Sequence, residues 1–304
     1  MRKNILITGG SGFIGSHLIE QWLQDGHSIQ VLTREPDKVI HRWEGQVAAQ
    51  DEFSKMRGPI DWVVNLAGEG IADQRWTESR KQVLRDSRIG VTERLVKWAE
   101  DTNQQFEVVL SGSAIGIYGG SDGSPDQQTM TEASPEGEDF AAKLCRDWEY
   151  AAMPLEKISQ RLVLLRTGLV WGEHQGMLKR LWFPFNMGLG GVIGSGDQYL
   201  SWIHIHDYCR AVHQLLNDSD VEGPINMTAP VPVTNRTFTE ELSETLKRPA
   251  LMPMPGCAAR LAFGEMSDLL TKGQRVIPRR LQEMGFRYDY PEAQKALDAI
   301  RAAW

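Results

Sequence analysis

The sequence predicts a doubly wound α/β fold, in which helices cover both faces of a parallel sheet. Short apolar runs alternate with amphipathic segments along the first half of the chain. The runs are nearly continuous in Val, Ile and Leu, which is typical of strands that are buried on both faces. A glycine cluster separates the first run from the first amphipathic segment, where the chain must turn tightly from a strand into a helix.

The expected elements follow one another in a regular order. Strand signals occupy residues 3–9, 27–34, 60–68, 106–119 and 160–172. The first helix, over residues 16–26, places its apolar side chains on one face and ends at Gly26 in a left-handed conformation; these side chains are Leu18, Ile19, Trp22 and Leu23. A long charged helix over residues 76–101 carries one apolar stripe, made of Leu84, Val91, Leu95 and Trp98. Its charged outer face favours solvent, although self-pairing into a homodimer stays open.

Composition indicates a globular protein with two parts. We expect residues 1–170 to form the main domain and residues 171–304 a smaller lobe, with helices near residues 207–217 and 238–246 and some elements returning to the sheet. The chain is 41% hydrophobic and 24% charged. Its net charge of −7 argues against a nucleic-acid partner. No apolar run approaches the roughly 18 residues of a membrane span.

The cysteines and the N-terminus favour a cytoplasmic location. The three cysteines are odd in number and widely spaced, and we interpret all of them as buried free thiols in a reducing compartment; they are Cys145, Cys209 and Cys257. A strand at the beginning of the sequence stands where the basic part of a secretory signal would be.

The glycine cluster has the spacing Gly9-x-x-Gly12-x-x-Gly15. This is a variant of the G-x-G-x-x-G fingerprint of the NAD(P)-binding Rossmann fold. One glycine makes the turn, one lets the backbone approach a pyrophosphate, and one lets the helix pack on the sheet. The N–H groups of the helix N-terminus then face the anion. We predict a dinucleotide site that also includes Ser11, Phe13 and Ile14.

The end of the second strand favours NADP(H) over NAD(H). NAD-binding proteins usually place Asp or Glu there to bind the ribose hydroxyls, whereas this sequence has Thr33 and Arg34. A guanidinium binds a 2′-phosphate in a bidentate manner, and a carboxylate would repel it. Arg34 as a merely solvated charge is the alternative interpretation, and Lys38 is a weaker second candidate.

These motifs resemble those of the short-chain dehydrogenase/reductase superfamily, in its extended, epimerase-like branch. "TGGSGFIG", "NLAG", "SGSAIGIYG" and "LRTGLVWG" are similar to successive motifs of that branch. The C-terminal "GEMSDLLTKGQRVIPRRLQEMGFRY" resembles a subgroup of nucleoside-diphosphate-sugar epimerase-like proteins that carries a DUF1731-type segment. The resemblance implies a Rossmann fold, a small-molecule substrate and further cofactor contacts from Leu66, Ala67, Gly68, Thr167, Gly168 and Val170.

The usual catalytic pair of that superfamily is missing. Its members use Tyr-x-x-x-Lys, where the lysine lowers the tyrosine pKa. The matching positions here are Ala141 and Cys145. Lys143 is two residues off, about 200° around the helix, and Phe140 has no hydroxyl. Neither half of the pair is in place.

Ser113 and Tyr118 are the remaining catalytic candidates. Ser113 matches the family's serine and would orient the reacting oxygen; a structural hydrogen bond at the strand end is an equal alternative. Tyr118 is the nearby phenol for acid/base work, although a core or interface tyrosine is the more common role for such a residue.

Other conspicuous residues are given structural interpretations. Leu200 and Ser201 stand where related epimerases hold the substrate diphosphate with an Arg-Asp pair. Asp207 is expected to cap the following helix. His204 and His206 form a lone pair without further ligands, so no metal site is predicted.

Two surface features are interpreted in the same way. The loop at residues 119–139 has six carboxylates and no Lys or Arg; a solvated loop is preferred over a lid. Arg279 and Arg280 are expected on a solvated helix face.

Two functions are consistent with the sequence. The first is an NADP(H)-dependent oxidoreductase or epimerase-like enzyme that transfers hydride to or from a small carbonyl or hydroxyl substrate. The second is a non-catalytic NADP(H)-binding sensor or scaffold with a protein partner. We favour the enzyme.

Overall fold

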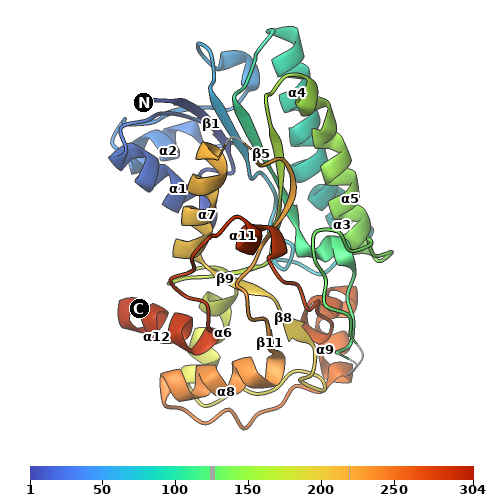
Figure 1. Cartoon of the computed structure of the whole chain (residues 1–304). Helices are drawn as coiled ribbons and strands as arrows, with labels where there is room; N and C mark the ends of the chain where they lie inside the picture. Colours follow the sequence, from blue (N-terminus) through green and yellow to red (C-terminus); the bar gives the residue numbers. More distant parts are fainter. Residues whose placement is uncertain (124–126, 219) are drawn as a thin grey trace.

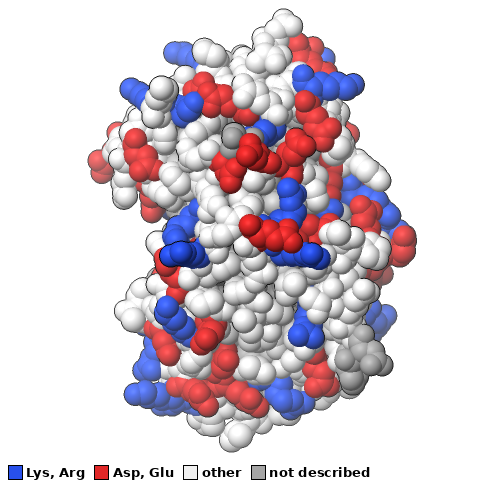
Figure 2. Space-filling view, in the orientation of Figure 1, with Lys and Arg blue, Asp and Glu red and all other residues white. Residues whose placement is uncertain are grey.

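The computed structural model describes residues 1–123, 127–218 and 220–304. The chain folds into two lobes, with the N-terminus in the upper lobe and the C-terminus in the lower lobe (Figure 1). On the face shown in Figure 2, acidic and basic side chains are interspersed over both lobes. No helix within the described residues is long and apolar enough to cross a membrane.

The upper lobe is built on one seven-stranded sheet in the order β10-β6-β5-β4-β1-β2-β3. All pairs in it are parallel. The strands are β1 (Asn4–Thr8), β2 (Ser28–Leu32), β3 (Ala48–Gln50), β4 (Trp62–Asn65), β5 (Val108–Ala114), β6 (Leu162–Thr167) and β10 (Gly223–Met227). The strand order reverses direction beside β1, because β2 lies on one side of it and β4 on the other. Ligands bind doubly wound sheets in the crevice outside the carboxyl ends of the strands at such a switch point.

Helices cover both faces of this sheet, as predicted. One core cluster joins the sheet to α1 (Phe13–Gln24) and α7 (Ile205–Asn217). The opposite face packs on α4 (Val91–Asp101) and α5 (Phe140–Ala152). α2 (Pro36–Arg42) connects β2 to the parallel edge strand β3, and neither α2 nor β3 was expected from the sequence. Gly26 follows α1 with a φ of +78°, which confirms the left-handed end.

The predicted long helix has an irregular middle. α3 (Glu78–Arg85) and α4 are joined by a π-helical turn at Asp86–Gly90. The apolar stripe is confirmed for Leu84, Leu95 and Trp98, which are buried. A continuous α-helix was therefore the wrong expectation. Single π-helical turns are frequent at functional sites, and this one lines the cavity described below.

The lower lobe has its own apolar core. Its elements are β7 (Leu169–Trp171), α6 (Gly176–Asn186), β8 (Tyr199–Leu200), β9 (Trp202–His204), β11 (Val233–Thr234), α8 (Asn235–Leu246), α9 (Gly256–Phe263), α10 (Asp268–Thr271) and α12 (Ala293–Ala303). The rings of Trp171 and Trp202 stack with centroids 4.4 Å apart, and those of Trp182 and Trp304 with centroids 3.9 Å apart. α7, β10 and α11 (Arg279–Glu283) lie beyond residue 170 yet pack on the upper lobe. The boundary at residue 170 remains a prediction.

The C-terminal segment holds the acidic loop against the upper lobe. Ser121 pairs with Gly273, and Met130 pairs with Val276. Glu132 is buried and accepts hydrogen bonds from the backbone N–H groups of Asn226 (3.0 Å) and Arg280 (3.3 Å). The loop is therefore attached to the rest of the protein at several points and is not freely solvated along its length. Its role as a lid stays a prediction. Residues 124–126 of this loop lie outside the described residues.

Two further expectations, on a helix cap and a cysteine, were also wrong. The cap of α7 is His204, whose Nδ1 accepts the N–H of His206 at 3.1 Å. Asp207 lies in the first turn of α7 instead. Its carboxylate accepts hydrogen bonds from the backbone N–H groups of Asp289 and Tyr290 rather than from the helix end. Cys257 is exposed, whereas the other two free cysteines are buried as expected.

Candidate functional site

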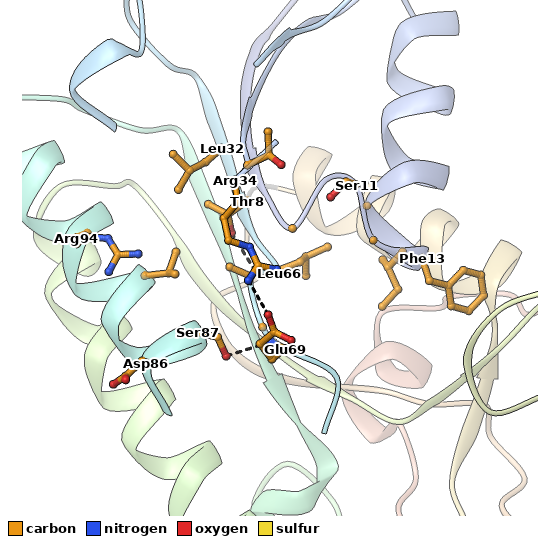
Figure 3. A pocket seen from close by; sticks show the side chains of 18 of the residues that line it. Thr8, Ser11, Phe13, Leu32, Arg34, Leu66, Glu69, Asp86, Ser87 and Arg94 are labelled. Atoms are coloured by element: carbon orange, nitrogen blue, oxygen red, sulfur yellow. Dashed lines mark hydrogen bonds and ion pairs between the residues drawn. The ribbon is translucent and has the colours of Figure 1, made fainter. Parts of the chain in front are cut away.

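A cavity of about 720 Å³ lies at the carboxyl ends of β1, β2 and β4. It is bounded by the N-terminus of α1 on one side and by α3, the π-helical turn and α4 on the other (Figure 3). All eleven cofactor residues predicted from the first 68 positions line it: Gly9, Ser11, Gly12, Phe13, Ile14, Gly15, Thr33, Arg34, Leu66, Ala67 and Gly68. The prediction therefore brought together residues from three separate segments of the chain.

Two glycines are required by the backbone around this cavity. Gly9 has a φ of +68°, and a Cβ on it would lie 2.5 Å from the carbonyl oxygen of Leu66 at the end of β4. A Cβ on Gly15 would lie 2.4 Å from the carbonyl oxygen of Gly9. The first glycine makes the turn beside the neighbouring strand, and the second lets α1 pack closely on the loop.

The N-terminus of α1 fits the phosphates of a dinucleotide. Gly12 is the N-cap residue, and no side chain among the described residues caps the helix. The first-turn residues Phe13, Ile14 and Gly15 line the cavity. Their N–H groups, together with the helix dipole, form a site for an anion. A Cβ on Gly12 would lie 3.2 Å from the carbonyl oxygen of Gly9.

Arg34 crosses the cavity to Glu69, which comes directly after the "NLAG" stretch. Its Nη1 lies 2.8 Å from Oε1 of Glu69, and its side chain is 89% exposed (Figure 3). Lys38, the weaker candidate, pairs with Glu35 and is not among the lining residues. Of the two candidates, only Arg34 faces the cavity.

Several lining residues were missed by sequence reasoning. Arg94 extends from α4 into the wall opposite α1 (Figure 3). Asp51, which directly follows β3, also lines the cavity. Asp86 and Ser87 come from the π-helical turn. Arg94 sits at a polar position of an amphipathic helix, where its sequence signal is that of a solvated charge. Only the packing of α4 against the strand ends brings it to the site.

A buried polar network supports the floor of the cavity. Thr8 Oγ1 donates to Asn65 Oδ1 at 2.6 Å and accepts the N–H of Ala67 at 3.0 Å. Asn65 Nδ2 donates to Thr92 Oγ1 at 2.9 Å, and Trp148 Nε1 donates to the same hydroxyl at 3.2 Å. The ends of β1 and β4 are therefore fixed to α4 and α5 in one arrangement.

The residues predicted at the nicotinamide end lie farther along the same sheet edge. Thr167 ends β6, and its hydroxyl lies 3.0 Å from that of Tyr208. Gly168 donates its N–H to the carbonyl of Met227, and Val170 packs against the main core. None of Thr167, Gly168 and Val170 lines the 720 Å³ cavity. Their cofactor contact remains a prediction.

Ser113 and Tyr118 belong to one buried network. Ser113 Oγ donates to Glu149 Oε1 at 2.6 Å. Arg166 forms a bidentate pair with Glu149 at 2.9 and 3.0 Å, and its Nη1 donates to the Tyr118 hydroxyl at 3.1 Å. That hydroxyl donates to Asn226 Oδ1 at 2.7 Å, and burial raises the pKa of Tyr118. Neither catalytic candidate lines the cavity, and both roles stay predictions.

Of the two positions of the missing catalytic pair, Cys145 lies in the core and Ala141 is half-buried. Cys145 is buried against Tyr118 and Val276, and burial raises its thiol pKa to about 12. Lys143 is exposed, so it points away from this core, as its offset along the helix predicted. The ring of Phe140 is covered by Trp76 at 5.0 Å and by the Lys81 ammonium at 5.3 Å.

The other conspicuous residues of the sequence lie outside the cavity and are described by their own contacts. Ser201 Oγ donates to the carbonyl of Gln274 at 2.7 Å. His204 is buried, and no cluster that could hold a metal ion occurs among the described residues. Arg279 pairs with Glu283 on an exposed helix face, as expected. Arg280 instead donates to the carbonyls of Glu222 and Pro224, which corrects its assignment to the solvated face.

The parallel sheet and its glycine turn into an uncapped helix define an NAD(P)-binding Rossmann-fold protein of the short-chain dehydrogenase/reductase type. Residues 5–227 match the NAD dependent epimerase/dehydratase family, and the chain belongs to that family. Residues 254–300 match the domain of unknown function DUF1731.

Relatives with similar sequences span nearly the whole chain. The epimerase family protein Mb2239 of Mycobacterium bovis is 37% identical over 297 residues, which cover 96% of each chain. YfhF of Bacillus subtilis is 34% identical over 98% of each chain. A chloroplastic homologue of SDR39U1 from Arabidopsis thaliana is 34% identical over 98% of this chain and 87% of its own.

Solved structures show the same architecture. Human epimerase family protein SDR39U1, crystallised with NADPH, is 32% identical, with a TM-score of 0.90 over 99% of this chain and all of its own. A nucleoside-diphosphate sugar epimerase from Corynebacterium glutamicum is 28% identical, with a TM-score of 0.78 over all of this chain and 59% of its own.

Proposed function

We propose that this protein is an NADP(H)-dependent oxidoreductase or epimerase-like enzyme that acts on a small carbonyl or hydroxyl substrate. The observation that carries the proposal is the cavity, which joins the uncapped N-terminus of α1 to a guanidinium at the end of β2. The structure of the human relative with NADPH supports the same choice of cofactor. When bound, the nicotinamide would supply or accept the hydride.

The chain's own residues would bind and orient the reactants. The α1 N-terminus would hold the pyrophosphate, and Arg34 would hold the 2′-phosphate. Ser113 would orient the reacting oxygen after releasing its hydrogen bond to Glu149. Either Tyr118 or a bound water would move the proton. The water is favoured, since the Tyr118 hydroxyl is engaged by Asn226 and Arg166 and its pKa is raised.

A turnover screen tests this proposal. We expect stereospecific transfer of deuterium from C4-labelled NADPH to at least one carbonyl compound or sugar nucleotide. Ser113→Ala should reduce kcat without changing the affinity for NADPH. If calorimetry shows that NADPH binds but no label leaves C4 across the panel, the catalytic part of the proposal fails.

The second candidate is a non-catalytic NADP(H) sensor with a protein partner. One observation favours it: Val276 of the C-terminal segment packs on Tyr118 and Cys145, beside the position of the absent catalytic pair. The absence of turnover, combined with a partner whose affinity changes when NADPH is added, would support this function. A defined partner that binds equally well with and without NADPH would contradict it.

A further inference from the structure

Glu69 is paired with Arg34, the residue proposed above to hold the cofactor's 2′-phosphate. Both side chains line the cavity, and Figure 3 shows the guanidinium of Arg34 reaching the Glu69 carboxylate within it. Their 2.8 Å contact uses the guanidinium that would bind a 2′-phosphate. One guanidinium cannot direct the same donors to both anions.

The two partners differ in how firmly they are held. The backbone N–H of Glu69 donates to Ser87 Oγ at 3.0 Å, and its carbonyl accepts from Arg88 Nη2 at 2.9 Å. Its other carboxylate oxygen lies 3.7 Å from Arg80 Nη1, and the Arg80 side chain is only 8% exposed. Glu69 is therefore fixed at the backbone and at the side chain.

Arg34 has no comparable anchor. The hydrogen bond to Glu69 is the one side-chain contact found for it among the described residues, and its side chain is 89% exposed against 25% for Glu69. When the pair separates, Arg34 is the partner that moves. Glu69 keeps Arg80 as its counter-ion, so its charge is not left buried and unpaired.

We propose that Glu69 is a specificity-determining residue that holds Arg34 in the ligand-free protein and exchanges it for the cofactor's 2′-phosphate. For a cofactor with that phosphate, the lost ion pair is replaced by a charge-assisted contact. A cofactor without it leaves the pair in place, so Glu69 opposes only the binding of the phosphorylated cofactor. This inference rests on the proposed NADP(H) function and deepens it by adding an acidic residue that opposes binding.

Glu69→Gln tests the exchange. Calorimetry with NADPH should show a Kd lowered by about two- to fivefold, because the competing charge is removed. The gain should vanish when Glu69→Gln is made in an Arg34→Ala background. Asp86→Asn is the matched control: it also neutralises a lining carboxylate, but Asp86 is bonded to Gln82 rather than to an arginine, and its NADPH gain should be smaller.

The outcomes separate this inference from the proposed function. Wild-type protein that binds NADPH no tighter than NADH would overturn both. If the wild type prefers NADPH, the exchange alone would be overturned when Glu69→Gln binds NADPH no more tightly than the wild type. It would also be overturned when Glu69→Gln still lowers the Kd for NADPH in the Arg34→Ala background. If the Gln variant does not fold, Glu69→Asp serves instead. It keeps the negative charge but shortens the side chain that reaches Arg34, and should give a smaller gain of the same sign.

Discussion

The NADPH preference assigned to Arg34 gives the most direct test of the site. Arg34→Ala removes the guanidinium that faces the cavity and leaves the α1 N-terminus unchanged. A hydrogen bond between charged groups contributes about 1.5–3 kcal/mol. Because Arg34 must first leave Glu69, an exposed ion pair worth up to about 1 kcal/mol is subtracted. The expected net loss is about 0.5–3 kcal/mol, or roughly 2- to 150-fold in the Kd for NADPH.

The assay is calorimetry with NADPH and NADH at one ionic strength. NADH affinity should change little, since that cofactor has no group for the guanidinium to grip. Raising the salt concentration should narrow the wild-type preference, because an exposed charge contact is screened. Lys38→Ala is the control, as Lys38 pairs with Glu35 outside the cavity lining. The reasoning would be refuted if Arg34→Ala lowered the affinities for NADPH and NADH equally, or if Lys38→Ala weakened NADPH binding as much as Arg34→Ala does.

Three further variants test the buried polar groups. Glu149→Gln leaves Arg166 buried without its counter-ion and should cost about 3–5 kcal/mol of unfolding free energy in denaturant titrations; Asp147→Asn, in a half-exposed pair on the same helix, should cost under about 1 kcal/mol. Burial lowers the pKa of His204 from 6.5 to about 4. The neutral imidazole therefore contributes to the free energy of unfolding above pH 6.5, and this contribution is lost as the pH falls toward 4. The wild type should therefore lose about 2 kcal/mol more than His204→Asn between pH 7.5 and 5 in urea titrations, and parallel losses would contradict this. Tyr118→Phe removes two buried hydrogen bonds and should destabilise the fold by about 1–3 kcal/mol while leaving the Kd for NADPH unchanged; a weakened Kd would place Tyr118 at the cofactor instead.

Local chemistry made the dinucleotide cavity predictable. The glycine spacing and the strand ends are set by backbone contacts between near neighbours in sequence and in the sheet. Gly9 meets the end of β4, and Gly15 meets Gly9 itself. Such contacts leave a pattern in the sequence, so eleven of the lining residues could be named from it. Arg34 was found for a similar reason, because it directly follows the second strand.

Residues that reach the site from distant elements left no such pattern. Arg94 carries a charge that the periodicity of its helix assigns to solvent, and Glu132, outside the cavity, belongs to a loop whose composition assigns it to solvent. Packing brings Arg94 to the cavity, and it buries Glu132 under the backbone N–H groups of Asn226 and Arg280. The π-helical turn at Asp86–Gly90 was missed because the apolar stripe alone fits a straight helix. Asp207 has the composition of a cap, but the N–H groups that it accepts come from residues 289–290.

The positions of these contacts along the chain bear on biosynthesis. Every residue that lines the dinucleotide cavity falls between positions 8 and 94, so all of them have left the ribosome before half of the protein is made. The cluster around Tyr118 depends on Val276, near the end of translation. A nascent chain therefore holds the cavity-lining residues long before this buried cluster is complete. A premature stop after the sheet would leave Ile115 and Ile117, which belong to the cluster, without Val276 packed beside them.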